Sequence, residues 1–239
     1  MNIAVIFAGG AGTRMNSKGK PKQFLEVNGK PIIIHTLEIF ECHPEIDAIV
    51  VSCIPGWIEY LQNLMEKYRI NKVKCIVGGG ITGQESIYNG LRSAVKIADE
   101  KCIVLIHDGV RPLINEKVIS DNIASVKVNG SAITSSVTKE TIVVVDSNNE
   151  ILNVPSRENS RIAKAPQSFY LQDILEVHEK ALKDGITNSI DSCTLMNQYG
   201  KNLFMIDGPY ENIKITTPDD FYTLRALLEA KENSQIYGY

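Results

Sequence analysis

The sequence lacks the features that would direct it into a membrane or onto a nucleic acid. Its longest apolar runs, such as residues 3–8 and 102–106, are far shorter than the roughly 20 residues that a membrane-spanning helix needs. It also has no basic block, because 25 Lys and Arg residues against 28 Asp and Glu residues leave a net charge of −3. We therefore expect neither a nucleic-acid partner nor a membrane partner.

Cysteine is scarce, and its spacing follows no known framework. The five cysteines are an odd number, and none of them forms a C-x-x-C pair. These features exclude a disulfide-stabilised miniprotein and a zinc site of the C-x-x-C type. The chain opens directly into a strand-like run without a preceding basic segment, so we expect no signal peptide and a cytoplasmic location.

Short apolar runs alternate with helical patterns through the first half of the chain. Residues 2–7, 48–53, 73–77 and 102–106 predict strands, and residues 31–40, 57–68 and 87–98 predict helices. This alternation is typical of β-α-β units, and strands without polar alternation are covered on both faces. The sequence predicts an α/β fold with a Rossmann-like, mostly parallel β-sheet flanked by helices, in a single domain over residues 1–239.

The pattern changes after about residue 137. Residues 141–145 and 150–154 predict two strands around a turn at 146–149, so a β-arm at about 138–160 is expected to project from the domain. Helices are expected over 171–183 and 218–231, with a strand over 202–206 between them. Because the arm would expose strand edges and apolar side chains, we expect it to pair with a second subunit in a homodimer.

A glycine-rich loop, A-G-G-A-G-T-R-M at residues 8–15, follows the first strand, with Lys18, Lys20 and Lys22 beyond it. Glycines allow the backbone to approach a phosphate, and the basic side chains neutralise its charge. A Walker A loop needs Gly-Lys-Ser/Thr, but both Gly-Lys pairs here precede proline. A dinucleotide-binding loop needs a third glycine where Met15 stands. The loop thus favours another phosphate-rich ligand, and a tight turn with solvated lysines is the alternative.

Polar residues at three further strand ends would meet this loop at one edge of a parallel sheet. Gly80 and Ser86 follow the third strand at the start of a helix, Asp108 stands at the tip of the fourth strand, and Lys214 precedes the last helix. A helix-capping role is the alternative for Asp108. Next to it, His107 is expected to be structural and Arg111 to pair with a local carboxylate.

Five ordered motifs resemble the CTP-dependent polyol-phosphate cytidylyltransferase family. They are A-G-G-x-G-x-R-M at 8–15, P-K-Q-F at 21–24, H-D-G-V-R-P at 107–112, P-Q-S-F at 166–169 and N-I-K-I-T-T-P at 212–218. The resemblance implies a GT-A-like nucleotidyltransferase fold. It also implies transfer of CMP from CTP to a polyol phosphate, with release of pyrophosphate and with Mg²⁺ or another divalent cation as cofactor. The F-A-G-G opening at residues 7–10 is nearer to the ribitol-5-phosphate branch than to the 2-C-methyl-D-erythritol 4-phosphate branch. We therefore favour D-ribitol 5-phosphate as the acceptor, with the erythritol phosphate of isoprenoid synthesis as the alternative.

The resemblance also implies a role for each matching residue. The catalytic cations would be Arg14, Lys22 and Lys214. The nucleotide would contact Ala8, Gly9, Gly10, Gly12, Gly80 and Ser86. The acceptor would contact Asp108, Thr141 and Arg157, with Arg157 brought by the dimer partner's arm and with Asp108 also holding the Mg²⁺.

The sequence departs from the family pattern around the acceptor. Ala165 stands where the ribitol branch favours threonine, Gly83 stands where an arginine is frequent, and Ile190 replaces a usual threonine. Two other classes of protein fit the sequence less well. A dinucleotide-dependent reductase is disfavoured by the missing third glycine, and a non-catalytic nucleotide-binding protein by the presence of all the predicted cations and Asp108.

Overall fold

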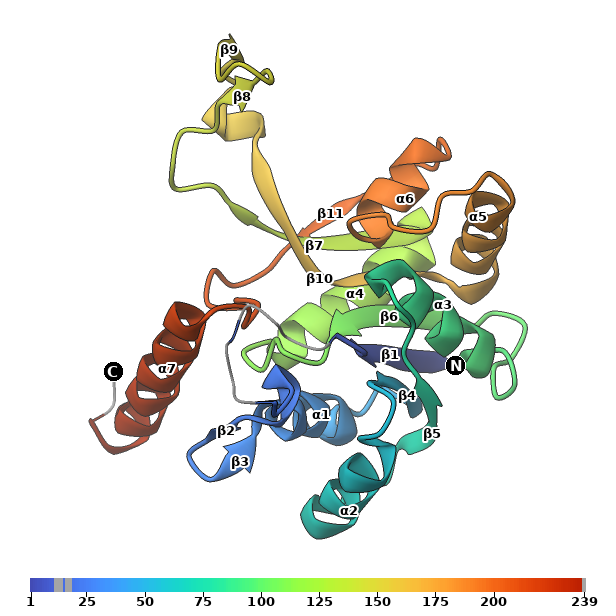
Figure 1. Ribbon diagram of the computed structural model, residues 1–239, viewed down its shortest axis with the longest axis vertical. Helices are drawn as coiled ribbons and strands as arrows, with labels where there is room; N and C mark the ends of the chain where they lie inside the picture. Colours follow the sequence, from blue (N-terminus) through green and yellow to red (C-terminus); the bar gives the residue numbers. More distant parts are fainter. Residues whose placement is uncertain (11–14, 16–18, 238–239) are drawn as a thin grey trace.

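A seven-stranded sheet with the strand order β11-β7-β10-β6-β1-β4-β5 forms the centre of the molecule (Figure 1). The computed structural model describes residues 1–10, 15 and 19–237. β10 runs antiparallel to both of its neighbours, and the other adjacent strands are parallel. The predicted mostly parallel sheet is therefore confirmed. In sheet order, the strands are β11 (Met205–Asp207), β7 (Ser131–Val137), β10 (Arg161–Tyr170), β6 (Ile103–Asp108), β1 (Asn2–Ala8), β4 (Ala48–Cys53) and β5 (Val73–Gly78).

Helices cover both faces of the sheet, as the almost continuously apolar central strands require. Side chains of β1 alternate between two cores, with Ala4 and Ile6 in one and Ile3 and Val5 in the other. The first core is completed by α1 (Ile32–Cys42), α2 (Ile58–Tyr68) and α4 (Glu116–Asn129). The second is completed by α3 (Gly83–Ala94), α5 (Leu171–Lys183) and α6 (Ser192–Gln198).

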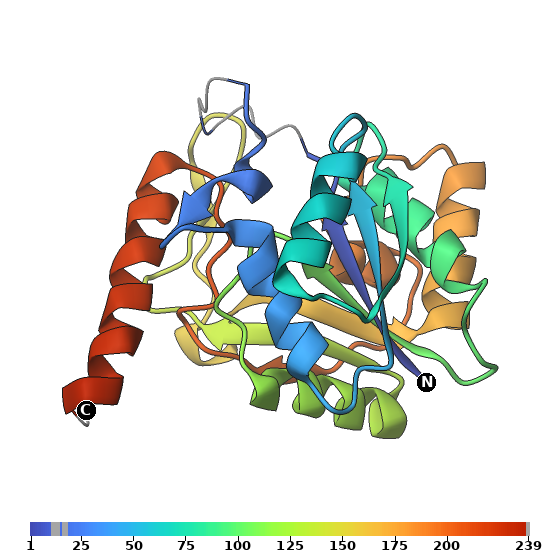
Figure 2. The ribbon, with the colours of Figure 1, turned by 90° about the horizontal axis from the view of Figure 1, so that it is seen from below.

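A smaller core joins the C-terminal helix to the beginning of the chain. The helix α7 (Pro218–Tyr237) lies beside the short hairpin of β2 (Glu26–Val27) and β3 (Lys30–Pro31), as both ribbon views show (Figures 1 and 2). Leu224 of α7 packs with Val27, Val110 and Ile215, all of which are buried. This packing fixes the segment that precedes α7 next to the loop that follows β6.

An arm projects from the sheet between β7 and β10 (Figure 1). It contains the antiparallel pair β8 (Val144–Val145) and β9 (Ile151–Asn153), followed by the 3-10 turn η3 (Arg157–Asn159). Its apolar side chains are exposed, among them Val143, Val145, Ile151 and Val154. The sequence predicted both the arm and these exposed side chains.

Several predicted boundaries differ from the structure. In the arm, the strands expected over 141–145 and 150–154 are confined to Val144–Val145 and Ile151–Asn153. The helix expected over 87–98 ends at Ala94, so Val95 and Ala98 lie beyond α3. The strand expected over 202–206 is confined to Met205–Asp207. The last helix runs past residue 231 to Tyr237. β11 is shorter than expected because only its three residues pair with the neighbouring strand β7.

The parallel strands β1, β4, β5 and β6 bring their carboxyl ends to one edge of the sheet. This edge therefore holds the loops that follow Ala8, Gly78 and Asp108. In the part of the chain that the structure describes, no helix is both long and apolar enough to cross a membrane.

Candidate functional site

A pocket of about 340 Å³ lies at the carboxyl ends of the strands. Its wall contains most of the residues predicted to bind the nucleotide, and also both predicted lysines and Asp108. Two predicted residues, Gly12 and Arg14, lie outside the described residues. The lining is formed by Phe7, Ala8, Gly9, Gly10, Lys22, Gln23, Gly80, Ile81, Thr82, Gly83, Ser86, Asp108, Val110, Lys214 and Thr216.

Glycines allow two loops to meet at the floor of this pocket. A Cβ atom on Gly9 would lie 2.6 Å from Ser86 Oγ, and one on Gly79 would lie 2.7 Å from the Cα of Gly9. The Ser86 hydroxyl donates to the carbonyl of Thr82 and accepts from the N–H of Gly80. The hydrogen bonds hold the Gly80 loop to the start of α3, and the loop after β1 packs closely against both. The N-terminus of a helix favours an anion.

Gln23 fixes the loop after β1 from the other side, a role that the sequence analysis missed. Its buried amide donates to the carbonyl of Ala8 at 2.7 Å and to the carbonyl of Gly10 at 3.3 Å. The Ala8 carbonyl also accepts from the N–H of Ile54. The motif P-K-Q-F could have pointed to this role, because its glutamine directly follows the predicted catalytic Lys22. In the structure, Gln23 lies in the 3-10 turn η2 (Lys22–Phe24).

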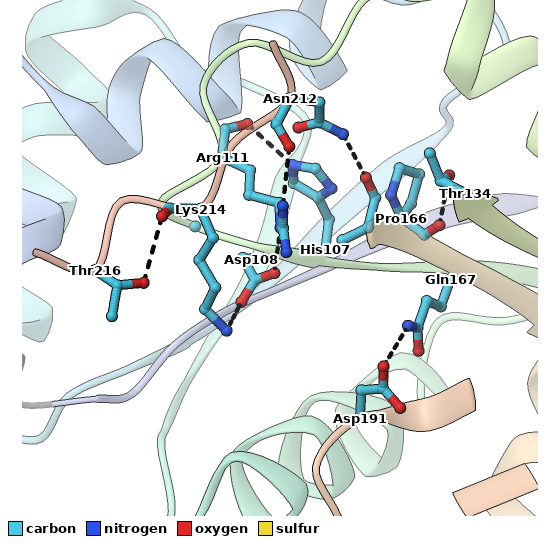
Figure 3. Close-up of polar contacts among 12 residues, drawn as sticks. His107, Asp108, Arg111, Thr134, Pro166, Gln167, Asp191, Asn212, Lys214 and Thr216 are labelled. Atoms are coloured by element: carbon cyan, nitrogen blue, oxygen red, sulfur yellow. Dashed lines mark hydrogen bonds and ion pairs between the residues drawn. The ribbon is translucent and has the colours of Figure 1, made fainter. Parts of the chain in front are cut away.

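Asp108 lies between two cations at the tip of β6 (Figure 3). Its Oδ2 accepts from Arg111 Nε at 2.8 Å, and its Oδ1 lies 2.6 Å from Lys214 Nζ. Burial raises the pKa of this carboxyl, but Arg111 and Lys214 outweigh it and hold the pKa well below the ordinary value. The carboxylate is therefore charged at neutral pH, and the predicted pairing of Arg111 with a local carboxylate is confirmed.

Arg111 also connects Asp108 to the chain that carries Lys214. Its Nη1 donates to the carbonyl of Asn212, and the Asn212 side chain donates to the carbonyl of Ala165 (Figure 3). His107 contacts the carbonyl of Arg111 through Nε2 at 3.1 Å. Burial lowers the pKa of His107 to about 4, so this imidazole is neutral at pH 7 and is placed as a structural residue.

Lys22 lies close to the start of α7. Burial raises the pKa of Asp220, but hydrogen bonds from the N–H groups of Thr217 and Thr216 and the nearby charge of Lys22 lower it below its ordinary value. The Asp220 carboxylate thereby holds the turn that contains Thr216, which lines the pocket. The wall thus presents two lysines from opposite ends of the chain.

A second pocket of about 270 Å³ adjoins the first. Both pockets are lined by Phe7, Gly83, Asp108 and Lys214, which therefore form their common boundary. The second pocket is further lined by Ile87, Ile106, Arg111, Ala163, Lys164, Ala165, Gln167, Ile190, Asp191 and Ser192. A site with two adjoining pockets and a cation, Lys214, at their boundary can hold two anionic substrates side by side.

Thr141 and Arg157 lie together in the arm, away from both pockets. Arg157 Nη2 donates to Thr141 Oγ1 at 3.1 Å. Neither residue lines either of the two pockets described above. Within one chain, the structure therefore does not bring these two predicted acceptor residues to Asp108.

The residues around Asp108 fit a divalent cation only in part. Among the described residues, no group of three or more His, Cys, Asp or Glu side chains could hold a metal ion. Both carboxylate oxygens of Asp108 already face a cation. Asp108 is the one carboxylate that the described residues place at the boundary of the two pockets, so most ligands of a Mg²⁺ ion here would have to be phosphate oxygens of the substrates.

Known proteins match the chain over nearly its whole length. The model of the family IspD, 2-C-methyl-D-erythritol 4-phosphate cytidylyltransferase, matches residues 2–230. The chain belongs to this family of cytidylyltransferases. The predicted family and reaction class, that of a polyol-phosphate cytidylyltransferase, are confirmed, and the reductase alternative is excluded.

Two relatives and one solved structure illustrate the match. The ribitol-5-phosphate cytidylyltransferase of Streptococcus agalactiae serotype III (strain NEM316) is 60% identical over 238 residues, 100% of each chain. The 2-C-methyl-D-erythritol 4-phosphate cytidylyltransferase of Clostridium botulinum (strain 657 / Type Ba4) is 39% identical, over 95% of this chain and 97% of the relative. The crystal structure of 4-diphosphocytidyl-2C-methyl-D-erythritol synthase from Anaerococcus prevotii DSM 20548 has a TM-score of 0.83. It is 27% identical in sequence, and the match covers 96% of both chains. The predicted nucleotidyltransferase fold is therefore confirmed.

Proposed function

We propose that this cytidylyltransferase transfers CMP from CTP to D-ribitol 5-phosphate, which yields CDP-ribitol and pyrophosphate. The observation that carries the proposal is the full-length identity of 60% to a ribitol-5-phosphate enzyme, against 39% to an erythritol-phosphate enzyme. The F-A-G-G opening supports the same choice. The product would supply ribitol phosphate to a teichoic acid or capsule polymer, and we expect the reaction to take place in the cytoplasm.

The two pockets support a displacement at the α-phosphorus of CTP. An oxygen of the acceptor phosphate forms a bond to the α-phosphorus, and the bond from that phosphorus to the pyrophosphate oxygen breaks. No general base is needed, because a phosphate monoester is already ionised near neutral pH. The protein's task is to stabilise negative charge, as in other phosphoryl transfers.

Cations of the chain would supply that stabilisation. Lys214 lies at the boundary between the pockets, where the α-phosphate and the acceptor phosphate would meet. Lys22 lies in the first pocket with the glycine loops, where the phosphates of CTP would lie. We assign the third cation to Arg14, and the nucleotide contacts to the predicted glycines together with Ala8 and Ser86.

We further propose that a divalent cation, Mg²⁺ or a substitute, accompanies the phosphates. When bound, the ion would neutralise charge on the nucleotide phosphates. Asp108 is the one carboxylate of the described pocket walls near the boundary that could reach it, and Lys214 would then have to release Oδ1. Removal of divalent ions by EDTA should abolish turnover, and added Mg²⁺ should restore it.

We also propose a homodimer in which the arm crosses to the partner. Val143, Val145, Ile151 and Val154 are about half exposed in the single chain. Apolar side chains gathered on a projecting hairpin favour burial against another surface. The partner's arm would bring Arg157 to the acceptor phosphate, and Arg157 lines neither of the two pockets of its own chain.

Pyrophosphate release with individual acceptors tests the proposed function. The reaction should require CTP and should proceed fastest with D-ribitol 5-phosphate, with ATP, GTP and UTP as controls for the base. 2-C-methyl-D-erythritol 4-phosphate is the second candidate acceptor, because relatives that are 39% identical are named for it. The absence of release with every acceptor would contradict the proposal.

A further inference from the structure

Lys164 is a buried lysine in the wall of the second pocket, outside the cations that the proposed mechanism uses. It stands in β10, and its residue is only 7% exposed. Lysine is almost never buried without a charged partner. Within the described part of the chain, however, no carboxylate forms an ion pair with Lys164.

Two backbone carbonyls hold the ammonium group of Lys164 instead. Nζ donates to the carbonyl of Tyr210 at 2.7 Å and to that of Pro209 at 3.3 Å. It also lies 5.0 Å from the centre of the Tyr210 ring. An ammonium group has three N–H donors, so the two carbonyls leave one donor over.

The charge on Lys164 is costly in this position. Burial lowers its pKa, and the nearby charges of Arg111 and Lys139 lower it further, against an opposite effect of Glu211. Apolar packing alone would be served by a methionine or leucine. A lysine that is retained in the pocket wall at this cost, with one N–H left over by the two carbonyls, favours a ligand that uses its charge.

Most of the other polar groups of this pocket wall are committed to the protein; the exception is the buried Ser192 Oγ, which has no hydrogen-bond partner among the described residues. The amide of Gln167 donates to Asp191 (Figure 3). Its oxygen accepts from the N–H of Cys193, and Asp191 also caps α6. Asp108 is engaged by its two cations. Near these groups the wall is apolar, with Ala163, Ala165 and Ile106. Few groups are thus left to recognise a polyhydroxylated chain.

We propose that Lys164 determines acceptor specificity by donating its remaining N–H to a hydroxyl of the bound polyol. This inference rests on the proposed function and deepens it. The phosphate of the acceptor would lie at the boundary formed by Asp108 and Lys214. Its carbon chain would then extend along β10 into the second pocket, whose wall includes Lys164.

The test compares D-ribitol 5-phosphate with a series of its monodeoxy analogues, each lacking one hydroxyl. With the unsubstituted protein, the kcat/KM for one analogue should be about 10–100-fold lower than for D-ribitol 5-phosphate, as expected for a lost hydrogen bond to a charged group. With D-ribitol 5-phosphate, the kcat/KM of Lys164→Met should be lower than that of the unsubstituted protein by a similar factor. With that analogue, the two proteins should have the same kcat/KM, because the hydrogen bond is missing in both. The KM for CTP should stay unchanged, and Lys164→Arg should recover part of the loss.

Lys139→Met is the matched control. Lys139 Nζ lies 3.7 Å from the centre of the same Tyr210 ring, but the side chain is exposed and does not line the pocket. This variant should keep the acceptor profile of the unsubstituted protein. It reports any effect of disturbing Tyr210 alone.

A merely structural Lys164 gives a different pattern. If it only holds the segment that contains Tyr210, Lys164→Met should lower kcat/KM by one factor for every acceptor, and this result would overturn the inference. If the unsubstituted protein has the same kcat/KM for every monodeoxy analogue as for D-ribitol 5-phosphate, the inference is overturned. This result needs no variant, so it decides the question even if Lys164→Met does not fold. An unsubstituted protein that uses no polyol phosphate would overturn the proposed function as well.

Discussion

Lys214 Nζ and Asp108 Oδ1 lie 2.6 Å apart at the boundary between the two pockets. The two residues come from segments far apart in the sequence, and the backbone contact between Ile215 N–H and the carbonyl of Val110 holds these segments together. Asp108 therefore both positions Lys214 and keeps its charge partly neutralised until phosphates arrive.

Lys214→Ala should lower kcat by about 10²–10³-fold, with a much smaller change in the KM for CTP. The reason is that the lysine acts mainly where negative charge develops in the transition state. Lys214→Arg should not fully restore the rate, because a planar guanidinium cannot replace a point charge in a confined site. Steady-state kinetics with saturating acceptor measures kcat and the KM for CTP of both variants. Unchanged turnover in Lys214→Ala would remove the residue from the mechanism.

Asp108→Asn should destabilise the fold as well as impair turnover. It leaves the largely buried guanidinium of Arg111 without its carboxylate, and breaking a buried ion pair costs about 3–5 kcal/mol. Urea denaturation measures the free energy of unfolding. Asp121→Asn is the control, because the Lys117–Asp121 pair is exposed and such pairs contribute at most about 1 kcal/mol. Equal effects of the two substitutions would argue against a structural role for the Asp108 pair.

The fold should lose stability as the pH falls from about 6.5 towards 4, in part because of His178. Burial lowers the pKa of this imidazole from 6.5 to about 4, and its ring nitrogens are buried without a hydrogen-bond partner in the described structure. In that pH range the unfolded chain binds a proton at His178 that the folded chain does not, so protonation favours unfolding.

His178→Phe keeps the ring that stacks on Tyr88 but removes the titrating group. Its free energy of unfolding should therefore fall less steeply over this pH range than that of the unsubstituted protein. His35 differs from His178 in its hydrogen bonding. Burial also lowers the pKa of His35, but its Nε2 contacts the carbonyl of Val27. A pH dependence that is the same with and without His178 would contradict the assignment.

Complementation between subunits tests the arm. Arg157→Ala should raise the acceptor KM strongly and leave CTP binding nearly unchanged, since the arginine is assigned to the acceptor phosphate alone. Mixed with Lys22→Ala under subunit exchange, it should recover activity, because one site of each heterodimer holds both intact residues. A monomeric, fully active protein in sedimentation, or no recovery on mixing, would refute the shared site.

Much of the fold could be predicted because its central strands are short and apolar. β7 is different: Ser131, Thr134 and Ser135 lie buried in it, and their hydroxyls donate to carbonyls of neighbouring segments. Such a strand has no apolar pattern to reveal it. The antiparallel direction of β10 is equally hidden, because pairing with β6 and β7 is settled by tertiary contacts and not by local sequence.

The site was predicted where motifs contain its residues and missed where only the tertiary structure assembles it. The pocket around Gly9, Ser86 and Lys214 follows from strand ends that share one edge. The anchoring of the loop by Gln23 and the burial of Lys164 could not be read from the sequence. Both depend on which carbonyls come within reach once distant segments pack together.

A competition experiment tests the central claim most directly. One reaction contains limiting CTP, Mg²⁺ and equal concentrations of D-ribitol 5-phosphate and 2-C-methyl-D-erythritol 4-phosphate, and mass spectrometry measures the ratio of the two CDP-linked products. That ratio equals the ratio of the kcat/KM values, free of differences in enzyme concentration. The account predicts that CDP-ribitol dominates the products. A predominance of the erythritol product, or no CDP-linked product of either acceptor, would contradict it.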